Sequence, residues 1–281
     1  MSHEVVVKEL CVFPVKGCQG TYLGEATITR AGVAGDHLFT LVYEGEPLDQ
    51  TRSPQLGGIG VTWDEEKGLL SLSHPENGQY VHERRESGGE LPMKIVLDHA
   101  VGVDQGDEVA SWLEHVVGRE VRLATAAKSW NINLPLPQFD RLHGTEKSRF
   151  YPVSPVSLSN VASLDDLNGR LKTPVPMNRF RMNMVVEGLE AWDENRIDTL
   201  SSPDLKLEHV TVCERCIIIT TDQQTGERKK TDLLQTLNKV HRRKKGERFG
   251  SGLVFGAYMG VAKEGNVRVG DRLTVEFKAS E

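Results

Sequence analysis

The sequence predicts a mostly β fold with a few helices, of the α+β class. From Val5 to Val101, apolar and polar residues alternate in short runs that turn residues separate, a pattern typical of strands. Helical periodicity is confined to a few short stretches. The 281 residues allow one large or two modest domains, each with a substantial buried core.

The composition is that of an ordinary globular protein, with 38% hydrophobic residues, 26% charged residues and a formal net charge of −6. This acidic balance argues against nucleic acid as a partner. No basic segment followed by a long apolar stretch opens the chain, and no later stretch approaches the roughly 18 apolar residues of a membrane span. Four cysteines are too few for a disulfide framework. We therefore expect a cytoplasmic monomer without a membrane anchor.

The first part of the chain contains five predicted strands and one helix. The strands are expected at 5–15, 23–30, 38–43, 58–63 and 69–73. An amphipathic helix follows over 108–117, with Gly118 as its stop signal. This helix is expected to close a first domain over 1–123, leaving 124–281 as the second domain.

Two loops of the first domain can approach an anion through backbone N–H groups. One follows the first strand and carries Lys16, and the other is the glycine-rich turn that ends at His37. The simpler alternatives are a solvated lysine and a surface histidine.

The second domain begins with an irregular segment over 128–149, either a linker or a loop over a site. Ser159 is expected to cap a helix that ends near Gly169. A strand is expected from Phe180, with Arg181 and Asn183 sharing one face, which either faces a site or faces solvent. The remaining predicted elements are a helix over 231–237, a basic run over 241–245, and strands over 253–262 and 272–277 joined by a Gly/Asn turn.

A Cys-x-x-Cys pair, Cys213 and Cys216, directly precedes a β-branched run over 217–221. The run predicts a buried strand that begins at Cys216. A thioredoxin-type dithiol requires a helix after the pair, and a zinc ribbon requires a second close pair. Two further interpretations remain open: an inert buried thiol pair, and a thiolate that binds a softer metal whose other ligands come from a cofactor.

Six motifs occur in order along the chain, and together they resemble the MOSC family. They are Phe13-Pro14-Val15-Lys16-Gly17-Cys18, Gly35-Asp36-His37, Asn178-Arg179-Phe180-Arg181-Met182-Asn183, Ala191-Trp192-Asp193-Glu194, Cys213-Glu214-Arg215-Cys216 and Val269-Gly270-Asp271. Within that family the chain resembles the amidoxime-reducing components of eukaryotes and bacterial relatives that detoxify N-hydroxylated bases. The resemblance implies a MOSC N-terminal β-barrel region followed by a MOSC β-barrel domain.

The resemblance also implies a molybdenum cofactor, a molybdopterin whose metal a cysteine thiolate ligates. Carried onto this sequence, the ligand is Cys216, and Cys213 is not a ligand. The residues implied to contact the pterin or its phosphate are Lys16, Ser154, Arg181 and Asn183. Charge-assisted donors such as Lys16 and Arg181 suit a dianionic phosphate.

The chain departs from the family pattern at two cofactor-binding positions. His37 stands where the family usually has arginine, so a titratable ring replaces a permanent cation. Gly17 stands where serine is common, which removes a hydroxyl donor. The histidine is expected to weaken cofactor binding or make it depend on pH, and only a backbone N–H can replace the donor lost at Gly17.

The implied activity is reduction of N-hydroxylated compounds, such as amidoximes and N-hydroxylated bases. Many bacterial relatives carry a C-terminal ferredoxin domain, which this sequence lacks, so a separate electron-transfer protein of the ferredoxin, flavin reductase or cytochrome type is expected. The alternative is a non-enzymatic carrier of sulfur or of the molybdenum cofactor, which needs only an exposed thiol and a docking surface.

Overall fold

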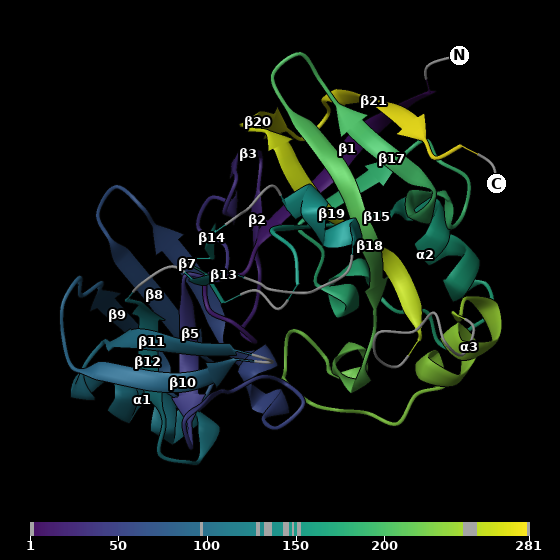
Figure 1. The fold of residues 1–281 in the computed structure, drawn as a ribbon. Helices are drawn as coiled ribbons and strands as arrows, with labels where there is room; N and C mark the ends of the chain where they lie inside the picture. The colour runs from purple at the N-terminus through teal and green to yellow at the C-terminus, as the bar shows by residue number, and fades with distance from the viewer. Residues whose placement is uncertain are drawn as a thin grey trace.

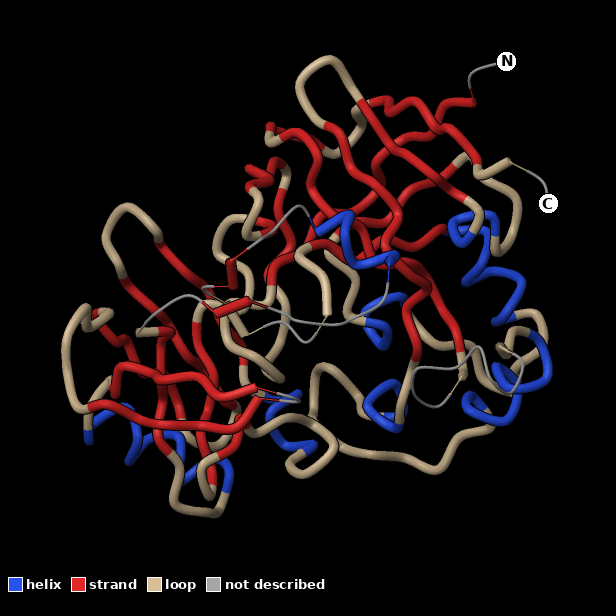
Figure 2. Tube along the Cα trace, viewed as in Figure 1, coloured by secondary structure: helices blue, strands red, loops and turns tan. Residues whose placement is uncertain are grey.

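The computed structural model describes residues 3–95, 98–127, 130–131, 137–142, 146–147, 149–150, 153–243 and 252–279. Strands dominate these residues, and three α-helices accompany them (Figures 1 and 2). The predicted mostly β, α+β class is confirmed. None of the helices in the described ranges is both long and apolar enough to span a membrane.

Seven strands of the largest sheet close into a barrel, because β1 pairs with both β21 and β16. The order around the barrel is β16-β15-β19-β18-β17-β21-β1, and β2 pairs with β1 outside this ring. The strands are β1 (His3–Val12), β2 (Thr21–Leu23), β15 (Val156–Asn160), β16 (Met184–Glu187), β17 (Ile197–Ser201), β18 (Lys206–Glu214), β19 (Val254–Lys263) and β21 (Arg272–Phe277). Alternation buries Val5 and Val7 of β1 in the largest apolar core, and after a register shift between Val7 and Glu9 the strand buries Leu10 in the same core.

A second group of strands forms smaller sheets beside the barrel, at the lower left of Figure 1. One sheet has the order β10-β11-β12-β5-β6 and another the order β7-β8-β9. Their strands are β5 (Phe39–Tyr43), β6 (Glu46–Pro47), β7 (Gly60–Asp64), β8 (Leu69–His74), β9 (Gly78–Glu83), β10 (Glu90–Ile95), β11 (Asp98–Asp104) and β12 (Arg122–Ala126). The apolar side of α1 (Asp107–Val117) packs with these sheets in a second core.

Two further small sheets complete the strand pairing. The first has the order β20-β3-β4 and joins β3 (Glu25–Thr29) and β4 (Gly32–Val33) to β20 (Gly265–Arg268). The second pairs β13 (Trp130–Asn131) with β14 (Glu146–Lys147). The predicted division of the chain at residue 123 stays a prediction, and the pairings of β1 with β16 and of β3 with β20 join chain segments on its two sides.

The predicted helix at 108–117 is confirmed, and Gly118 ends it in the left-handed conformation. The second helix, α2 (Val161–Asn168), ends at Gly169 as predicted, but Asn160 caps it in place of Ser159. The Asn160 side chain accepts a hydrogen bond from the N–H of Ala162, whereas Ser159 belongs to β15. The third helix, α3 (Leu233–Val240), matches the predicted one and continues past Leu237.

Five 3₁₀ helices complete the regular elements of the described residues. They are η1 (Pro54–Gly58), η2 (Pro137–Leu142), η3 (Met177–Phe180), η4 (Asp193–Asn195) and η5 (Ile217–Thr220).

Besides the cap of α2, three sequence-based assignments were wrong. The β-branched run after Cys216 is the 3₁₀ helix η5 and not a strand, because β18 already ends at Glu214. The strand expected from Phe180 begins only at Met184, after η3 and a left-handed Arg181. The two tail strands are separated by β20, which pairs with β3, and not by a simple turn. The segment 128–149 and the end of the basic run at 241–245 lie largely outside the described residues.

Candidate cofactor site

The candidate site lies where η3, the loop after β1 and the loop after η5 meet. Arg181 joins the three segments, because its Nη1 atom donates to the carbonyl of Cys18 at 2.6 Å and to Oε1 of Gln223 at 2.8 Å. Its guanidinium also lies 4.2 Å from the ring centroid of Phe13, the residue after β1. Segments far apart in the sequence thus converge on one cation.

The second terminal nitrogen of Arg181, Nη2, is buried and has no hydrogen-bond partner within the described part of the chain. Burial lowers the pKa of Arg181, which shows that the charge is held at a cost in desolvation. A buried charged donor without a partner is costly. This atom is therefore the strongest structural indication that an anion binds here.

Lys16 and His37 share the electrostatic environment of Arg181. The Nζ atom of Lys16 donates to the carbonyl of Phe150 at 3.0 Å, and burial lowers the pKa of Lys16 while Asp49 raises it. Nδ1 of His37 bonds Oδ2 of Asp36 at 2.5 Å. Arg181 acts on both groups, so the site gathers two cations and a histidine around the buried carboxylate of Asp36.

The surroundings of His37 favour the neutral form of its ring. Burial lowers its pKa below the ordinary value of 6.5, and the charges of Lys16 and Arg181 lower it further, although Asp36 opposes them. Asp36 holds the ring in place and accepts a hydrogen bond from the N–H of Phe13 at 2.7 Å through its other oxygen. His37 therefore supplies no permanent charge to the site.

Gly17 follows Lys16 and has a left-handed backbone with φ of +85°. A Cβ atom at this position would lie 2.8 Å from Cδ1 of Leu56. Glycine is thus required by both the backbone and the packing, which explains why the common serine is absent here.

We expect Gly17→Ser to lower the free energy of unfolding by about 1–2 kcal/mol or more, because a side chain in the left-handed region is strained and Leu56 must also move. Chemical denaturation measures the change. Gly45→Ser is the matched control, since Gly45 has φ of +74° but a Cβ atom added there would meet no other segment within 4 Å. An equal decrease in the free energy of unfolding in both variants would show that the contact with Leu56 does not contribute to the destabilisation.

The other two predicted phosphate contacts, Ser154 and Asn183, are already hydrogen-bonded within the fold. Oγ of Ser154 donates to the carbonyl of Met259 at 2.6 Å. Oδ1 of Asn183 accepts from the N–H and Oγ of Ser157 at 3.0 and 2.9 Å, and its Nδ2 donates to the carbonyl of Cys11 at 3.2 Å. Both residues join neighbouring strands, and their contact with a cofactor stays a prediction.

The two cysteines of the Cys-x-x-Cys pair differ in exposure. Cys213 is fully buried at the end of β18, and burial raises the pKa of its thiol. Cys216 is exposed and stands directly before η5. Only Cys216 presents a thiol to a ligand, whereas Cys213 shares a hydrogen bond with the buried hydroxyl of Tyr258.

Arg215, beside Cys216, connects the thiol segment to η3. Its Nη1 atom donates to the carbonyl of Phe180 at 2.8 Å, and its Nε atom donates to the carbonyl of Phe255 at 2.9 Å. Phe180 directly precedes Arg181, so the backbone that carries Cys216 is tied to the backbone that carries the buried cation. Within the described residues no group of three or more His, Cys, Asp or Glu side chains forms a metal site.

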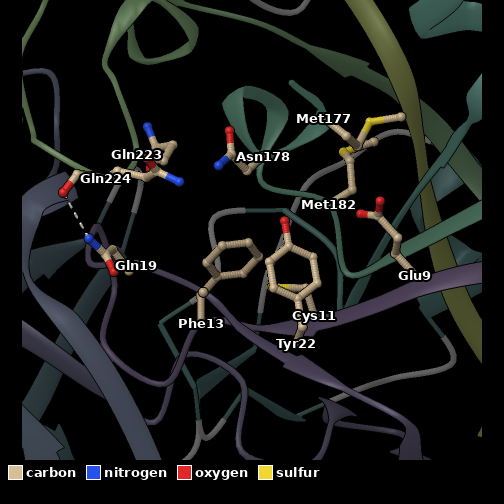
Figure 3. A pocket seen from close by; sticks show the side chains of 11 residues that line it. Glu9, Cys11, Phe13, Gln19, Tyr22, Met177, Asn178, Met182, Gln223 and Gln224 are labelled. Atoms are coloured by element: carbon tan, nitrogen blue, oxygen red, sulfur yellow. Dashed lines mark hydrogen bonds between the residues drawn. The ribbon is translucent and has the colours of Figure 1, made fainter. Parts of the chain in front are cut away.

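A pocket of about 150 Å³ opens beside this cluster, between β1, β2, η3 and the loop after η5 (Figure 3). Phe13 and Tyr22 stand side by side, with Met182 and Glu9 on one side and Gln19 and Gln224 on the other. A cavity of roughly 150 Å³ holds one benzene-sized ring. Burial raises the pKa of Glu9, the acidic side chain of the lining.

Sequence reasoning did not identify Gln50 and Gln223, although both contact the candidate site. Gln223 lies in a polar stretch after the β-branched run, and Gln50 lies in a segment without any motif. Their roles come from contacts between distant parts of the chain, which no local pattern reports.

The chain is thus a β-barrel protein with a buried cationic site suited to an anionic ligand, and Arg215 ties the segment of the exposed Cys216 thiol to that site. Residues 4–120 match the MOSC N-terminal beta barrel domain, and residues 143–274 match the MOSC domain. The chain is 30% identical over 284 residues to the Mitochondrial amidoxime reducing component 2 of Bos taurus, a match that covers 94% of this chain and 81% of the relative.

The Mitochondrial amidoxime-reducing component 1 of Homo sapiens is 29% identical over 282 residues, again with 94% of this chain and 81% of the relative covered. The corresponding component 2 of Macaca fascicularis is 31% identical over 279 residues, with 94% and 82% covered. This chain belongs to the MOSC family, as the motifs predicted.

Proposed function

We propose that this protein is a molybdenum-cofactor-dependent reductase of N-hydroxylated compounds. The observation that carries the proposal is the buried Nη2 atom of Arg181, which lacks a hydrogen-bond partner among the described residues and shares its electrostatic environment with Lys16. The relatives of the chain are named for amidoxime reduction. A phosphate or pterin oxygen would satisfy the Nη2 donor, and the charge-assisted donors Arg181 and Lys16 suit an anion. The donor set of the site thus fits the cofactor.

Each residue of the site has a distinct task in this proposal. Arg181 and Lys16 would hold the phosphate, and the exposed thiol of Cys216 would ligate molybdenum as a soft thiolate. The bound cofactor supplies two-electron chemistry. Arg215 keeps the Cys216 segment against η3 through its bonds to Phe180 and Phe255.

The neighbouring pocket suits the organic part of a small substrate. Conversion of an N–OH group to N–H and water consumes two electrons and two protons, so the site needs groups that carry protons. Glu9 fits this task because burial raises its pKa and favours the protonated form. Phe13 and Tyr22 provide aromatic surface for the rest of the substrate.

The electrons are proposed to come from a separate electron-transfer protein, and the protein is proposed to act as a cytoplasmic monomer. A carrier of sulfur or of the molybdenum cofactor is the second candidate function. The exposure of Cys216 favours it, because a carrier needs an accessible thiol.

The deciding experiment expresses the protein in a host that makes the cofactor and measures its molybdenum and pterin content. Reduction of benzamidoxime is then followed with a chemical or protein electron donor. Bound cofactor with turnover supports the reductase, and bound cofactor without turnover favours a cofactor carrier. Absence of cofactor contradicts both of these and favours a sulfur carrier.

We expect cofactor retention to fall as pH rises. In the free protein the pKa of His37 is lowered, and a bound phosphate beside the ring would raise it. At a pH between the pKa of His37 in the free protein and its pKa in the bound protein, cofactor binding is accompanied by uptake of one proton. This pH range begins below the ordinary histidine pKa of 6.5. The charge of His37⁺ strengthens binding at low pH and disappears once pH exceeds the pKa of the bound form. Retention is measured after gel filtration at a series of pH values.

The variant His37→Arg should flatten this dependence, because arginine stays charged. His115→Gln is the control, since His115 is an exposed residue of α1 that bonds the carbonyl of Ser111. Superimposable curves for His37→Arg and the unmodified protein would show that His37 has no electrostatic role.

A further inference from the structure

Gln50 and Gln223, which are 173 residues apart, form a reciprocal pair of amide hydrogen bonds. Nε2 of Gln50 donates to Oε1 of Gln223 at 2.8 Å, and Nε2 of Gln223 donates to Oε1 of Gln50 at 2.8 Å. Gln50 is fully buried and Gln223 is 6% exposed. A buried amide that loses its partner leaves unsatisfied polar atoms, so each glutamine holds the other in one orientation.

This pair is also bonded to both cationic segments of the site. Nε2 of Gln50 donates to the carbonyl of Gly17, directly after Lys16, at 2.6 Å. Oε1 of Gln223 accepts from Nη1 of Arg181 at 2.8 Å. A continuous hydrogen-bonded path therefore runs from the Lys16 loop to the Arg181 guanidinium.

The amide group has a property that a carboxylate would lack here. An amide oxygen accepts a hydrogen bond from Arg181 without adding a negative charge, so the guanidinium is oriented but not neutralised. With Nη1 held by Gln223 and Cys18, Nη2 is left for another partner. The glutamine pair therefore orients the guanidinium of Arg181 and leaves its positive charge available to an anion.

We propose that Gln50 and Gln223 are positioning residues that set the spacing of Lys16 and Arg181 for the phosphate of the cofactor. This inference rests on the proposed function, because it assumes that these two cations hold a phosphate. The two glutamines act through Arg181 and the Lys16 loop and do not touch the reacting atoms. They also couple the loop after β1 to the loop after η5, so the site forms only when both segments are docked.

The test measures binding of inorganic pyrophosphate to the cofactor-free protein by calorimetry, together with molybdenum and pterin content after expression with cofactor. We expect Gln50→Ala and Gln223→Ala each to weaken pyrophosphate binding about tenfold, the order of one charge-assisted hydrogen bond. The double variant should bind little worse than either single variant, because each substitution already breaks the pair. Gln223→Glu should weaken binding more than Gln223→Ala, because its carboxylate would compete with the anion for Arg181.

Gln105→Ala is the matched control for a loss of buried amide bonds. Gln105 is 1% exposed and bonds Arg85, Val103 and Thr125 in the neighbouring sheet. It should lower the unfolding temperature as much as Gln50→Ala does, yet leave pyrophosphate affinity unchanged.

Three results would overturn the inference. Unchanged affinity in Gln50→Ala and Gln223→Ala would exclude a positioning role, and an equal loss of affinity in Gln105→Ala would assign the effect to general destabilisation. Stronger binding in Gln223→Glu than in Gln223→Ala would contradict the charge argument. If the unmodified protein binds neither pyrophosphate nor cofactor, the proposed function itself is wrong. This outcome is distinguishable from failure of the glutamine inference, because it is seen in the unmodified protein without any variant.

Discussion

Cys216→Ser is expected to remove molybdenum from the protein, whereas Cys213→Ser should retain most of it. An alcohol is a far poorer donor to a soft metal than a thiolate is, and the thiol of Cys216 is exposed. The thiol of Cys213 is fully buried and bonded to Tyr258, so it cannot reach a ligand. Metal analysis of both variants after expression with cofactor measures the difference.

The two variants should also differ in stability: Cys213→Ser, which keeps the metal, should be the less stable of the two. Cys216→Ser changes an exposed side chain and should leave the unfolding temperature unchanged. Cys213→Ser places a more polar group in an apolar environment and should cost about 1–3 kcal/mol. Equal metal loss in both variants would contradict the proposal and favour a site that uses both cysteines.

The spacing of apolar residues was sufficient to predict several strands, among them β1, β5 and β8, and the helix α1, because these elements depend on local pattern. Residues 217–221 show where the pattern misleads. An apolar β-branched run is compatible with a strand, but β18 has already reached its end at Glu214, and the chain turns into η5. An apolar run fixes neither the conformation nor the burial, since Ile217 is 43% exposed whereas Ile219 is buried.

The closure of the barrel could not be predicted from residue patterns alone. The contacts of β1 with β16 and β21 join positions more than a hundred residues apart, and periodicity carries no information on such partners. The motifs identified Lys16, His37 and Arg181, and the structure brings all three together. It also shows Ser154 and Asn183 engaged in bonds between strands, which a linear motif cannot reveal.

Arg181 shows that a sequence motif can identify a site residue without predicting its backbone conformation, which here is left-handed. Alternation placed its side chain on one face of a strand, yet its φ is +51° and it ends η3. Non-glycine residues in this region are uncommon and are held there by their surroundings. Here the surroundings are the bonds to Cys18 and Gln223 and the ring of Phe13.

Arg181→Met is expected to abolish tight cofactor binding while the protein stays folded. The substitution removes a charge whose burial lowers its pKa, so the free protein is relieved of a desolvation cost as it loses two hydrogen bonds. These effects oppose each other, and the free energy of unfolding should change by no more than about 1 kcal/mol. Methionine keeps much of the side-chain volume against Phe13.

The effect on binding has no such compensation. Each lost charge-assisted hydrogen bond to phosphate should cost about 1.5–3 kcal/mol, or roughly ten- to 150-fold in affinity. Lys16→Met should show a loss in the same range, because Lys16 offers one point charge. Arg52→Met is the control, since Arg52 pairs with Glu44 and Glu46 on the surface. Titration of the cofactor-free proteins with pyrophosphate measures the effect on anion affinity, and denaturation curves measure the effect on stability. Full affinity in Arg181→Met would mean that the Nη2 atom of Arg181 binds no anion. Unfolding of Arg181→Met would mean that the charge of Arg181 is needed for the fold.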